Sequence, residues 1–400
     1  MFLTKQDIID AKNRLGQTIH HTGMYYSGTF SNFAGNKIYL KTENLQKTGS
    51  FKVRGAYNKI AKLSELQKLK TVVCASAGNH AQGVAYSATT KGIESIIVMP
   101  KGTPIAKVSA TAGYGAKTVL YGDFYDDAHA HALKLAKDKK AEFIHPFDDL
   151  DIIAGQGTIA LEMLSDNPDL DAIVVPVGGG GLLAGVAFMA KQIKPSIKVI
   201  GVQAEKADAF SQSFKAKSKI ALNDIYTIAD GIAVKNPGDV TLEYILKYAD
   251  DILTVTDNEI AETVIHLMER AKLVVETAGA TGVALAINKK LNMQNKNVAC
   301  VLSGGNIDVG LIHKIVEKGL VSRGRQMTLS VVLPDKPGAL QKFASIMGDN
   351  NANIISVRYD RTHSELNLNE TILHIAFETS GQQHGEQVLS NLKKAGYQLQ

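Results

Sequence analysis

The sequence predicts an α/β protein with two open, twisted parallel sheets, followed by a smaller α+β domain at the carboxyl end. Short apolar runs alternate with helical patterns over the first 320 residues, which is typical of parallel strands joined by helical crossovers. After residue 320 the order of expected elements changes to β-α-β-β-α, the order of a ferredoxin-like domain. The length of 400 residues also suggests two or three domains.

The expected strands of the first part are the apolar runs at residues 37–40, 71–75, 95–99, 117–121, 172–177, 198–202, 252–255 and 298–302. Helical patterns lie between most of these runs, for example at residues 79–90 and 182–193. We expect the polar segment 321–326 to be a linker between a first domain at 1–320 and a second at 327–400. The expected elements of the second domain are residues 327–333, 339–347, 353–360, 370–377 and 384–395, with a short last strand at 397–400.

Composition and charge exclude several classes of protein. Hydrophobic residues make up 45% of the chain and charged residues 21%, as in ordinary globular proteins. The net charge of +5 is small and its charges are interspersed, so no nucleic-acid partner is expected. No apolar run reaches the roughly 18 residues of a membrane span, and the amino end lacks the apolar core of a signal peptide. Cys74 and Cys300 lie in apolar runs as inert buried thiols do, which favours a cytoplasmic location.

The segment TGSFKVRGA at residues 48–56 contains the most informative residue of the chain. Ser50 is a candidate N-cap, which would place Lys52 in the first turn of the following helix. There the helix dipole and the nearby Arg54 would both disfavour a protonated amine. A lowered pKa is what a Schiff-base lysine requires. The alternative is an ordinary solvated lysine, the commonest state of this residue type.

The segment PVGGGGL at residues 176–182 joins an expected strand to an expected helix. Its glycines allow a tight turn in which several backbone N–H groups point at one ligand, and the helix dipole favours an anion there. We therefore expect a phosphate site made by Gly178, Gly179, Gly180, Gly181 and Leu182. One alternative is a turn without a ligand. Another is a dinucleotide site, because the segment up to Ala184 also matches that glycine fingerprint, with Glu205 about 20 residues further on.

Two further strand ends carry polar groups. The segment SAGNH follows an expected strand and begins a helix, so its N–H donors suit a substrate carboxylate. The residues concerned are Ser76, Ala77, Gly78, Asn79 and His80. Asn79 could also bond a ring oxygen, and for His80 we favour a structural role over that of a base. Ser303 places a neutral hydroxyl at the end of another strand, although it could equally be a plain loop serine.

Together, a nucleophilic lysine, a phosphate site, a carboxylate loop and a neutral donor suit pyridoxal phosphate and an amino-acid substrate. Residues 20–320 resemble the threonine/serine dehydratase family of fold-type II pyridoxal-phosphate enzymes, whose fold is like that of the tryptophan synthase β subunit. The segments that carry the resemblance are EN at 43–44, TGSFKVRGA at 48–56, SAGNHAQG at 76–83, IAGQGT at 153–158, GGGGL at 178–182, ADG at 229–231 and LSGGNID at 302–308.

The resemblance implies a role for each of these site residues. Lys52 would form the Schiff base with pyridoxal phosphate, and Phe51 would flank the ring. Asn79 would bond the ring hydroxyl, the segment 178–182 would hold the phosphate, and Ser303 would face the pyridine nitrogen. The small domain, about residues 45–147, would be inserted into the large one. The implied reaction is the deaminating dehydration of L-threonine to 2-oxobutanoate and ammonia, with L-serine as a second substrate. The 2-oxobutanoate could feed isoleucine biosynthesis.

Two departures distinguish this chain from the serine racemases, which resemble it closely. Those enzymes carry a serine as second base at the position of Ala77. Alanine cannot transfer a proton, so we expect no racemisation. Their divalent-metal site uses two acids where this chain has Gln203 and Ala209, so we expect no metal there.

Residues 327–400 resemble an ACT regulatory domain through LPDKPGAL at 333–340 and NANII at 351–355. Such domains pair and bind small amino acids, which implies a homo-oligomer, dimer or tetramer, and a branched-chain amino-acid effector. The alternative is a domain used only for assembly. For the whole chain, the rival functions are another β-eliminating or β-replacing enzyme, such as a cysteine-synthase-like one, and an amino-acid sensor whose cleft is inactive.

Overall fold

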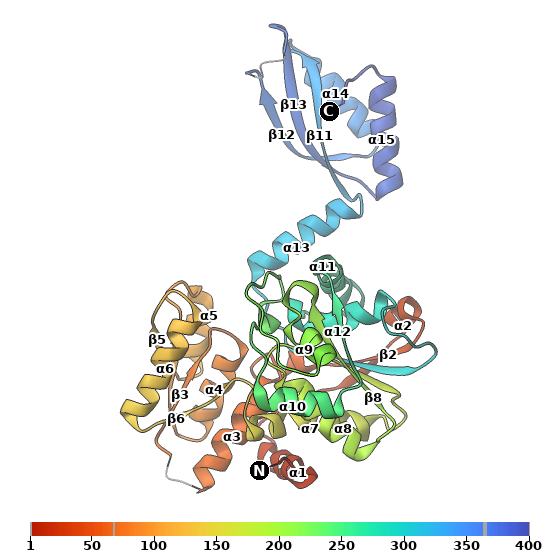
Figure 1. Cartoon of the computed structure of the whole chain (residues 1–400). Coiled ribbons are helices and arrows are strands. Elements are labelled where there is room, and N and C mark those ends of the chain that lie inside the picture. The colour runs from red at the N-terminus through yellow and green to blue at the C-terminus, as the bar shows by residue number, and fades with distance from the viewer. Residues whose placement is uncertain (1, 67–68, 363–365, 400) are drawn as a thin grey trace. The chain divides into compact units, whose positions relative to one another are not determined.

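The computed structural model of the chain describes residues 2–66, 69–362 and 366–399. The chain divides into two compact units, Met1–Asp308 and Val309–Gln400 (Figure 1). Among the described residues, no helix combines the length and the apolar character that crossing a membrane requires.

The larger sheet of the first unit has six strands in the order β1-β2-β10-β7-β8-β9. All neighbouring strands are parallel except β1 and β2, which are antiparallel. The strands are β1 (Met24–Ser27), β2 (Lys37–Lys41), β7 (Ala172–Pro176), β8 (Lys198–Ala204), β9 (Asp251–Val255) and β10 (Asn297–Val301).

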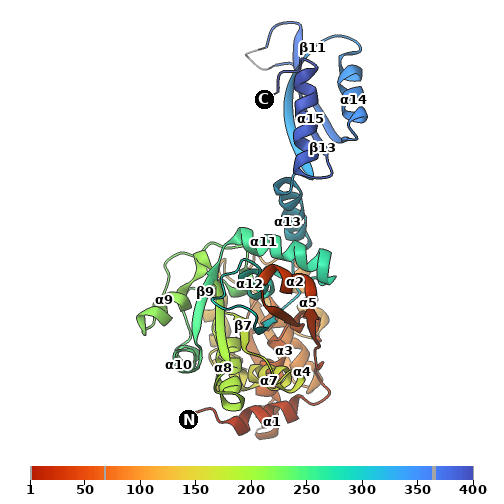
Figure 2. The same ribbon diagram turned by 90° about the vertical axis from the view of Figure 1, so that its right-hand side faces the viewer.

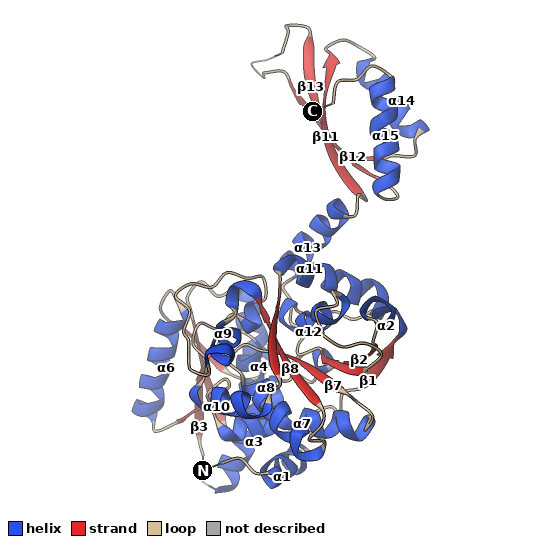
Figure 3. Cartoon of the chain, turned by 45° about the vertical axis from the view of Figure 1, so that its right-hand side comes forward, coloured by secondary structure: helices blue, strands red, loops and turns tan. Residues whose placement is uncertain are grey.

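Helices cover both faces of this sheet (Figures 2 and 3). One face is covered by α1 (Lys5–Leu15), α7 (Leu150–Asp166), α8 (Gly181–Ile193) and α10 (Asp239–Tyr248), and the other by α2 (Gly28–Ala34), α11 (Asp257–His266) and α12 (Thr277–Ile287). Successive side chains of a strand point to opposite faces, so Ile173 and Val175 pack in the core with α7 and α8, whereas Val174 approaches Gly282 of α12. Burial on both faces explains why β7 is apolar throughout.

The second sheet has four parallel strands in the order β5-β4-β3-β6. They are β3 (Thr71–Ala75), β4 (Glu94–Met99), β5 (Lys117–Leu120) and β6 (Glu142–Phe143). The helices α3 (Lys52–Leu66) and α4 (Asn79–Thr90) pack against one face and α6 (Tyr125–Lys139) against the other, while α5 (Ile105–Gly113) contacts β5 and α4. All four strands come from the part of the chain between β2 and β7, so this smaller sheet interrupts the sequence of the larger one.

The remaining elements of the first unit are short. They are η1 (Glu43–Leu45), η2 (Glu205–Ala207), α9 (Ala209–Ala216), η3 (Asp230–Ile232) and η4 (Leu267–Ala271).

The second unit begins with α13 (Val309–Ser322) and contains a three-stranded antiparallel sheet in the order β11-β13-β12. Its strands are β11 (Gln326–Pro334), β12 (Asn353–Asp360) and β13 (Glu370–Glu378), and its other helices are α14 (Ala339–Asp349) and α15 (Gln382–Lys394). One face of the sheet forms a core with α14 and α15 that includes Val331, Phe343, Phe377 and Leu392.

The fold class predicted from the sequence is confirmed. The differences concern short elements whose sequence pattern is weak. The short strands β1 and β6 are not predicted, because β1 is partly exposed and β6 has only two residues. The expected last strand at 397–400 is reduced to a bridge between Leu399 and Val331, and residue 400 lies outside the described part. The expected linker at 321–326 is shorter than predicted, since α13 ends at Ser322 and β11 begins at Gln326.

Candidate active site

Loops from both sheets of the first unit meet at the beginning of α3. The backbone N–H of Phe51 donates to the carbonyl oxygen of Ser303 at 3.1 Å, which joins the α3 start to the loop after β10. The Nδ2 of Asn306, in the same loop, donates to the Oδ1 of Asn79 at 2.8 Å, and Asn79 begins α4 just after the loop that follows β3. Ligands of open α/β sheets bind at the carboxyl ends of the strands. The hydrogen bonds therefore bring together segments that the sequence analysis singled out separately.

Lys52 is the first residue of α3, and its amine is enclosed by protein. Its Nζ donates to the carbonyl oxygen of Pro146 at 2.8 Å and lies 5.4 Å from the centre of the Phe51 ring. Burial lowers the pKa of this amine from 10.5 to about 8, against the opposing negative charge of Glu276. A sizeable fraction of the amine is thus unprotonated just above neutral pH, as a nucleophile requires.

The structure corrects the prediction that the charge of Arg54 lowers the pKa of Lys52. This side chain is completely buried, and its guanidinium makes hydrogen bonds with both carboxylate oxygens of Glu43 and of Glu162. Lys41 completes the group, with its Nζ 2.6 Å from Glu162 Oε2. Because two carboxylates neutralise Arg54, burial and not the charge of Arg54 lowers the pKa of Lys52.

Ser50 is not the N-cap that the sequence predicts. Its hydroxyl is buried and has no hydrogen-bond partner among the described residues, while its backbone forms a β-bridge with Gly304. Together with the bond from Phe51 to Ser303, this bridge places the first turn of α3. Tertiary pairing with the loop after β10 therefore positions Lys52, and a local cap does not.

The turn between β7 and α8 offers backbone donors and leaves no room for side chains. Gly180 has a φ of +91°, and a Cβ on Gly179 would lie 2.1 Å from the ring of Phe147. The hydroxyl of Thr241 donates to the carbonyl oxygen of Gly179 at 2.8 Å and holds the turn. Within the described residues, the N–H groups of Gly178, Gly179 and Gly180 donate to no other protein group. The first N–H groups of α8 have no partner within the helix, so this turn can bind a phosphate.

The loop after β3 also presents unused backbone donors. Its N–H groups at Ala77 and Asn79 donate to no protein group in the part of the chain that the structure describes. The N–H of Gly78 is held by the hydroxyl of Ser76 at 3.3 Å, and the space beside the α-carbon of Gly78 is open. This arrangement can bind a carboxylate at the start of α4.

His80 lies deeper than its neighbours in this loop. The residue is buried, and its Nε2 is 2.9 Å from the carbonyl oxygen of Ile144. Burial, and then the positive charge of Lys52, lower the pKa of the imidazole to about 3. The neutral ring held by a backbone carbonyl supports the structural role that we favour from the sequence.

Ser303 is buried beside the start of α3, with 3% of its surface exposed. Its carbonyl oxygen accepts the hydrogen bond from Phe51. The side chain thus belongs to the loop that pairs with Ser50 and Phe51, where a neutral hydroxyl could contact a ligand.

Glu276 is a site residue that the sequence analysis missed. Both of its carboxylate oxygens lie 2.9 Å from the Nδ2 of Asn79. Burial raises the pKa of this carboxyl to about 7, with the hydrogen bond from Asn79 opposing the shift and the charge of Asp230 adding to it. The sequence does contain a signal, because Glu276 is the only charged residue in the run VVETAGA at 274–280.

Other contacts of the site have no comparable signal in the sequence. Pro146 and Phe147, which contact Lys52 and Gly179, lie in a loop between β6 and α7. They are far from both residues in the chain, so only the fold brings them there.

At the position of the metal site of serine racemases, the amide of Gln203 is already bonded within the protein. Its Nε2 donates to the carbonyl oxygen of Val177 and its Oε1 accepts from the N–H of Ser211. Over the described part of the chain, no group of three or more His, Cys, Asp and Glu residues is arranged to hold a metal ion.

Family models match both parts of the chain. Residues 15–304 match the model described as pyridoxal-phosphate dependent enzyme. The chain belongs to the pyridoxal-phosphate dependent enzyme family. Residues 327–396 match the ACT domain model, which confirms the second resemblance. The cofactor is pyridoxal phosphate, and the dinucleotide alternative for the glycine turn is wrong.

Relatives of this pyridoxal-phosphate dependent enzyme include proteins with and without the second unit. It is 45% identical over 397 residues to an L-threonine ammonia-lyase of Thermotoga maritima, covering 99% of each chain. The structure of the processed form of threonine deaminase isoform 2 from Solanum lycopersicum is similar with a TM-score of 0.75 and 36% identity, over 78% of this chain and 87% of that one. Maize serine racemase has a TM-score of 0.75 and 34% identity, over 79% of this chain and 98% of that one.

The site fits the cofactor of the family. The glycine turn has unused amide donors for a phosphate, and any Cβ on Gly179 would fill the turn. A buried amine of lowered pKa lies at Lys52, and Ser303, whose residue is 3% exposed, carries a hydroxyl. Each is a donor type that pyridoxal phosphate can use.

Proposed function

We propose that this chain is an L-threonine ammonia-lyase, which converts L-threonine to 2-oxobutanoate and ammonia and also accepts L-serine. The observation that carries the proposal is the enclosed amine of Lys52, whose pKa is lowered by burial. The full-length similarity to the Thermotoga maritima enzyme supports the choice of threonine.

The chain's own groups would divide the work as follows. Amide groups of residues 178–182 would bind the phosphate, and Phe51 would flank the ring. The N–H groups of Ala77 and Asn79 bind the substrate carboxylate. Lys52 would take the α-proton, because about half of its amine is unprotonated at pH 8. Pyridoxal phosphate, when bound, supplies the electron sink for the charge left at the α-carbon.

The choice of elimination over other outcomes rests on two side chains. Ser303 would offer the pyridine nitrogen a neutral hydroxyl and not a carboxylate, so the nitrogen is not held protonated and negative charge at the α-carbon is stabilised less. Prompt loss of the β-hydroxyl is thereby favoured over transamination. Ala77 has no proton to transfer, which disfavours the racemisation named for the maize relative.

The test is an assay of purified holoenzyme with L-threonine, L-serine and sulfide. Release of 2-oxobutanoate from threonine, with no cysteine formed from serine and sulfide, supports the proposal over a cysteine-synthase-like enzyme. An amino-acid sensor with an inactive cleft would release no oxo acid from either substrate. Formation of D-serine at a rate comparable with deamination would contradict the assignment of Ala77.

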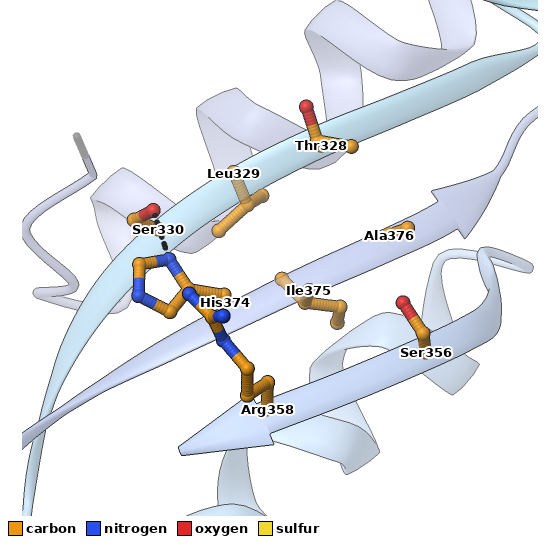
Figure 4. A pocket seen from close by; sticks show the side chains of 8 residues that line it. All are labelled: Thr328, Leu329, Ser330, Ser356, Arg358, His374, Ile375 and Ala376. Carbon is orange, nitrogen blue, oxygen red and sulfur yellow. Dashed lines mark hydrogen bonds between the residues drawn. The ribbon is translucent and has the colours of Figure 1, made fainter. Parts of the chain in front are cut away.

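We also propose that the second unit binds a small amino acid, with isoleucine and valine as the first candidates. A hollow of about 450 Å³ lies on the sheet face opposite α14 and α15 (Figure 4). Arg358 and His374 line it, and His374 Nδ1 is 2.8 Å from the hydroxyl of Ser330. The guanidinium of Arg358 forms no ion pair with the described residues, so it can take a carboxylate.

Calorimetric titration of the full chain with isoleucine and valine tests the effector. Arg358→Ala should abolish the heat of binding, while Arg361→Ala should leave it unchanged, because Arg361 already pairs with Asp335. Equal threonine turnover with and without both amino acids would leave assembly as the function of the unit. We propose that the chain forms a homo-oligomer, which sedimentation velocity of the holoenzyme checks, and that it is cytoplasmic, which fractionation of cells that produce it checks.

A further inference from the structure

Glu276 is a buried carboxyl that the proposed mechanism does not use. Only 6% of the residue is exposed, and its backbone N–H donates to the carbonyl oxygen of Gly304 at 2.9 Å. A Cβ on Gly304 would lie 2.4 Å from Oε1 of Glu276. The carboxyl therefore occupies a space that exists because residue 304 is a glycine.

The carboxyl is directed at one partner, the amide of Asn79. The Nδ2 of Asn79 is equidistant from the two oxygens, at 2.9 Å from each. At the other end of the amide, Asn79 Oδ1 accepts from Asn306 Nδ2 at 2.8 Å. Asn306 Nδ2 also donates to the carbonyl oxygen of Thr48 at 2.8 Å. The amide thus has an acceptor at its nitrogen and a donor at its oxygen, which permits one orientation only.

One hydrogen of the Asn79 amide remains for a ligand. Equal distances to two oxygens fit a single N–H directed between them, and an amide nitrogen carries two hydrogens. We propose that Glu276 is a positioning residue that fixes the orientation of the Asn79 amide, so that its second N–H is presented to the ring hydroxyl of the cofactor. This inference rests on the proposed contact between Asn79 and pyridoxal phosphate.

The role requires a carboxylate and not just any polar side chain. A carboxylate only accepts, so it binds the amide by its nitrogen. Glutamine can turn to present either its oxygen or its nitrogen, and it would then tolerate both orientations of Asn79. In the reversed orientation, Asn79 would point an oxygen where the N–H was and would repel the amide of Asn306.

Glu276 makes no hydrogen bond to Lys52 in the described structure, although its charge raises the pKa of that amine. Its effect on the ring hydroxyl of the cofactor would therefore pass through the hydrogen bond to Asn79. This distinguishes a positioning residue from a second base. The distinction can be measured, because an effect that passes through Asn79 must disappear when the Asn79 amide is removed.

The experiment compares wild type, Glu276→Gln, Asn79→Ala and the double variant as cofactor-loaded proteins at pH 8, where Glu276 is mostly ionised. The readouts are the dissociation constant of pyridoxal phosphate and the ratio of the visible to the near-ultraviolet absorption band, which responds to hydrogen bonding at the ring hydroxyl. We expect Glu276→Gln to weaken binding about tenfold and to change the band ratio. In the Asn79→Ala background the same substitution should no longer change the band ratio, and the part of the binding loss that passes through Asn79 should disappear, which leaves only the effect of the Glu276 charge on Lys52.

Glu94→Gln is the control, because Glu94 is exposed and pairs with Lys117 far from this site; it should match wild type. If Glu276→Gln does not fold, Glu276→Asp serves instead, since the shortened carboxylate cannot reach Asn79 and should shift the band ratio in the same direction. Equal effects of Glu276→Gln with and without Asn79, or no change in the band ratio, would overturn the inference. A wild-type protein without a visible band would overturn the proposed function as well, which separates the two failures.

Discussion

Replacing Arg54 with methionine tests the buried charge cluster formed by Lys41, Glu43, Arg54 and Glu162. The side chains of the cluster are at most 6% exposed, and two positive charges balance two negative ones. Arg54 alone donates five hydrogen bonds. Methionine fills much of the same volume, but it leaves two buried carboxylates with a single lysine.

The expected loss follows from that imbalance. Removing one partner of a buried ion pair costs about 3–5 kcal/mol, because the remaining charge stays desolvated. We expect the free energy of unfolding of the first unit to fall by about this amount near neutral pH. Since Arg54 lies two residues after Lys52 in the first turn of α3, the affinity for pyridoxal phosphate should fall as well.

The loss of stability in Arg54→Met should become smaller as the pH falls. In the wild type, burial would raise the pKa of Glu162, but the charges of Arg54 and Lys41 outweigh it and hold the pKa below 4.5. This contribution to stability is present above pH 4.5 and is lost as the pH falls through the depressed pKa. Without Arg54 burial prevails and the pKa rises, so the variant loses stability as the pH rises above 4.5. The difference between the two proteins should therefore shrink toward acid.

Urea denaturation of the cofactor-free proteins, followed by circular dichroism at several pH values, measures this difference. Lys198→Met is the matched control, because the pair of Lys198 with Asp250 has side chains 60% and 20% exposed and should contribute about 1 kcal/mol or less. The reasoning fails if Arg54→Met loses no more stability than Lys198→Met. It also fails if the Arg54→Met deficit is the same at acid and neutral pH.

Three further predictions concern the site. Lys52→Ala should bind no cofactor covalently, so its visible band and its threonine turnover should both be absent. A band in this variant that borohydride bleaches would contradict the role of Lys52. In the wild-type apoprotein, the rate of cofactor loading should increase as the pH rises through about 8, the pKa of the amine. Gly179→Ala should weaken cofactor binding more than tenfold because its Cβ meets Phe147 at 2.1 Å, whereas Gly102→Ala, whose Cβ meets nothing within 4 Å, should bind normally. Ser303→Asp should raise transamination relative to elimination, and an unchanged product ratio would be evidence against the role of the neutral hydroxyl.

The elements that the sequence predicts well are those with strong local patterns. The strand β7 is apolar throughout and β10 is apolar after Asn297, because helices cover both of their faces, and this burial is visible in the residues themselves. The glycine turn is equally visible, since four consecutive glycines at a strand end are rare unless the backbone must approach a ligand. The strand β6, with two residues, carries no such pattern.

The environment of each site residue could not be predicted in the same way. The sequence suggests that Ser50 caps α3 and that Arg54 lowers the pKa of Lys52, because both lie nearby in the chain. The structure replaces both ideas with contacts from distant segments: Gly304 pairs with Ser50, and Glu43 and Glu162 neutralise Arg54. For a buried residue, neighbours in the sequence do not indicate which side chains it contacts, because the fold brings its partners from distant segments.

By itself, then, the sequence determined the α/β class, the ACT unit and the cofactor, and it singled out Lys52 as the candidate lysine, because each depends on residue types in a local order. Only the tertiary structure decided what lowers the pKa of Lys52 and what holds Asn79. A pKa is set by the solvent and charges around a group, and the orientation of an amide is set by its donors and acceptors. In this protein those surroundings come from Pro146, Glu276 and Asn306, residues that the fold brings from far along the chain.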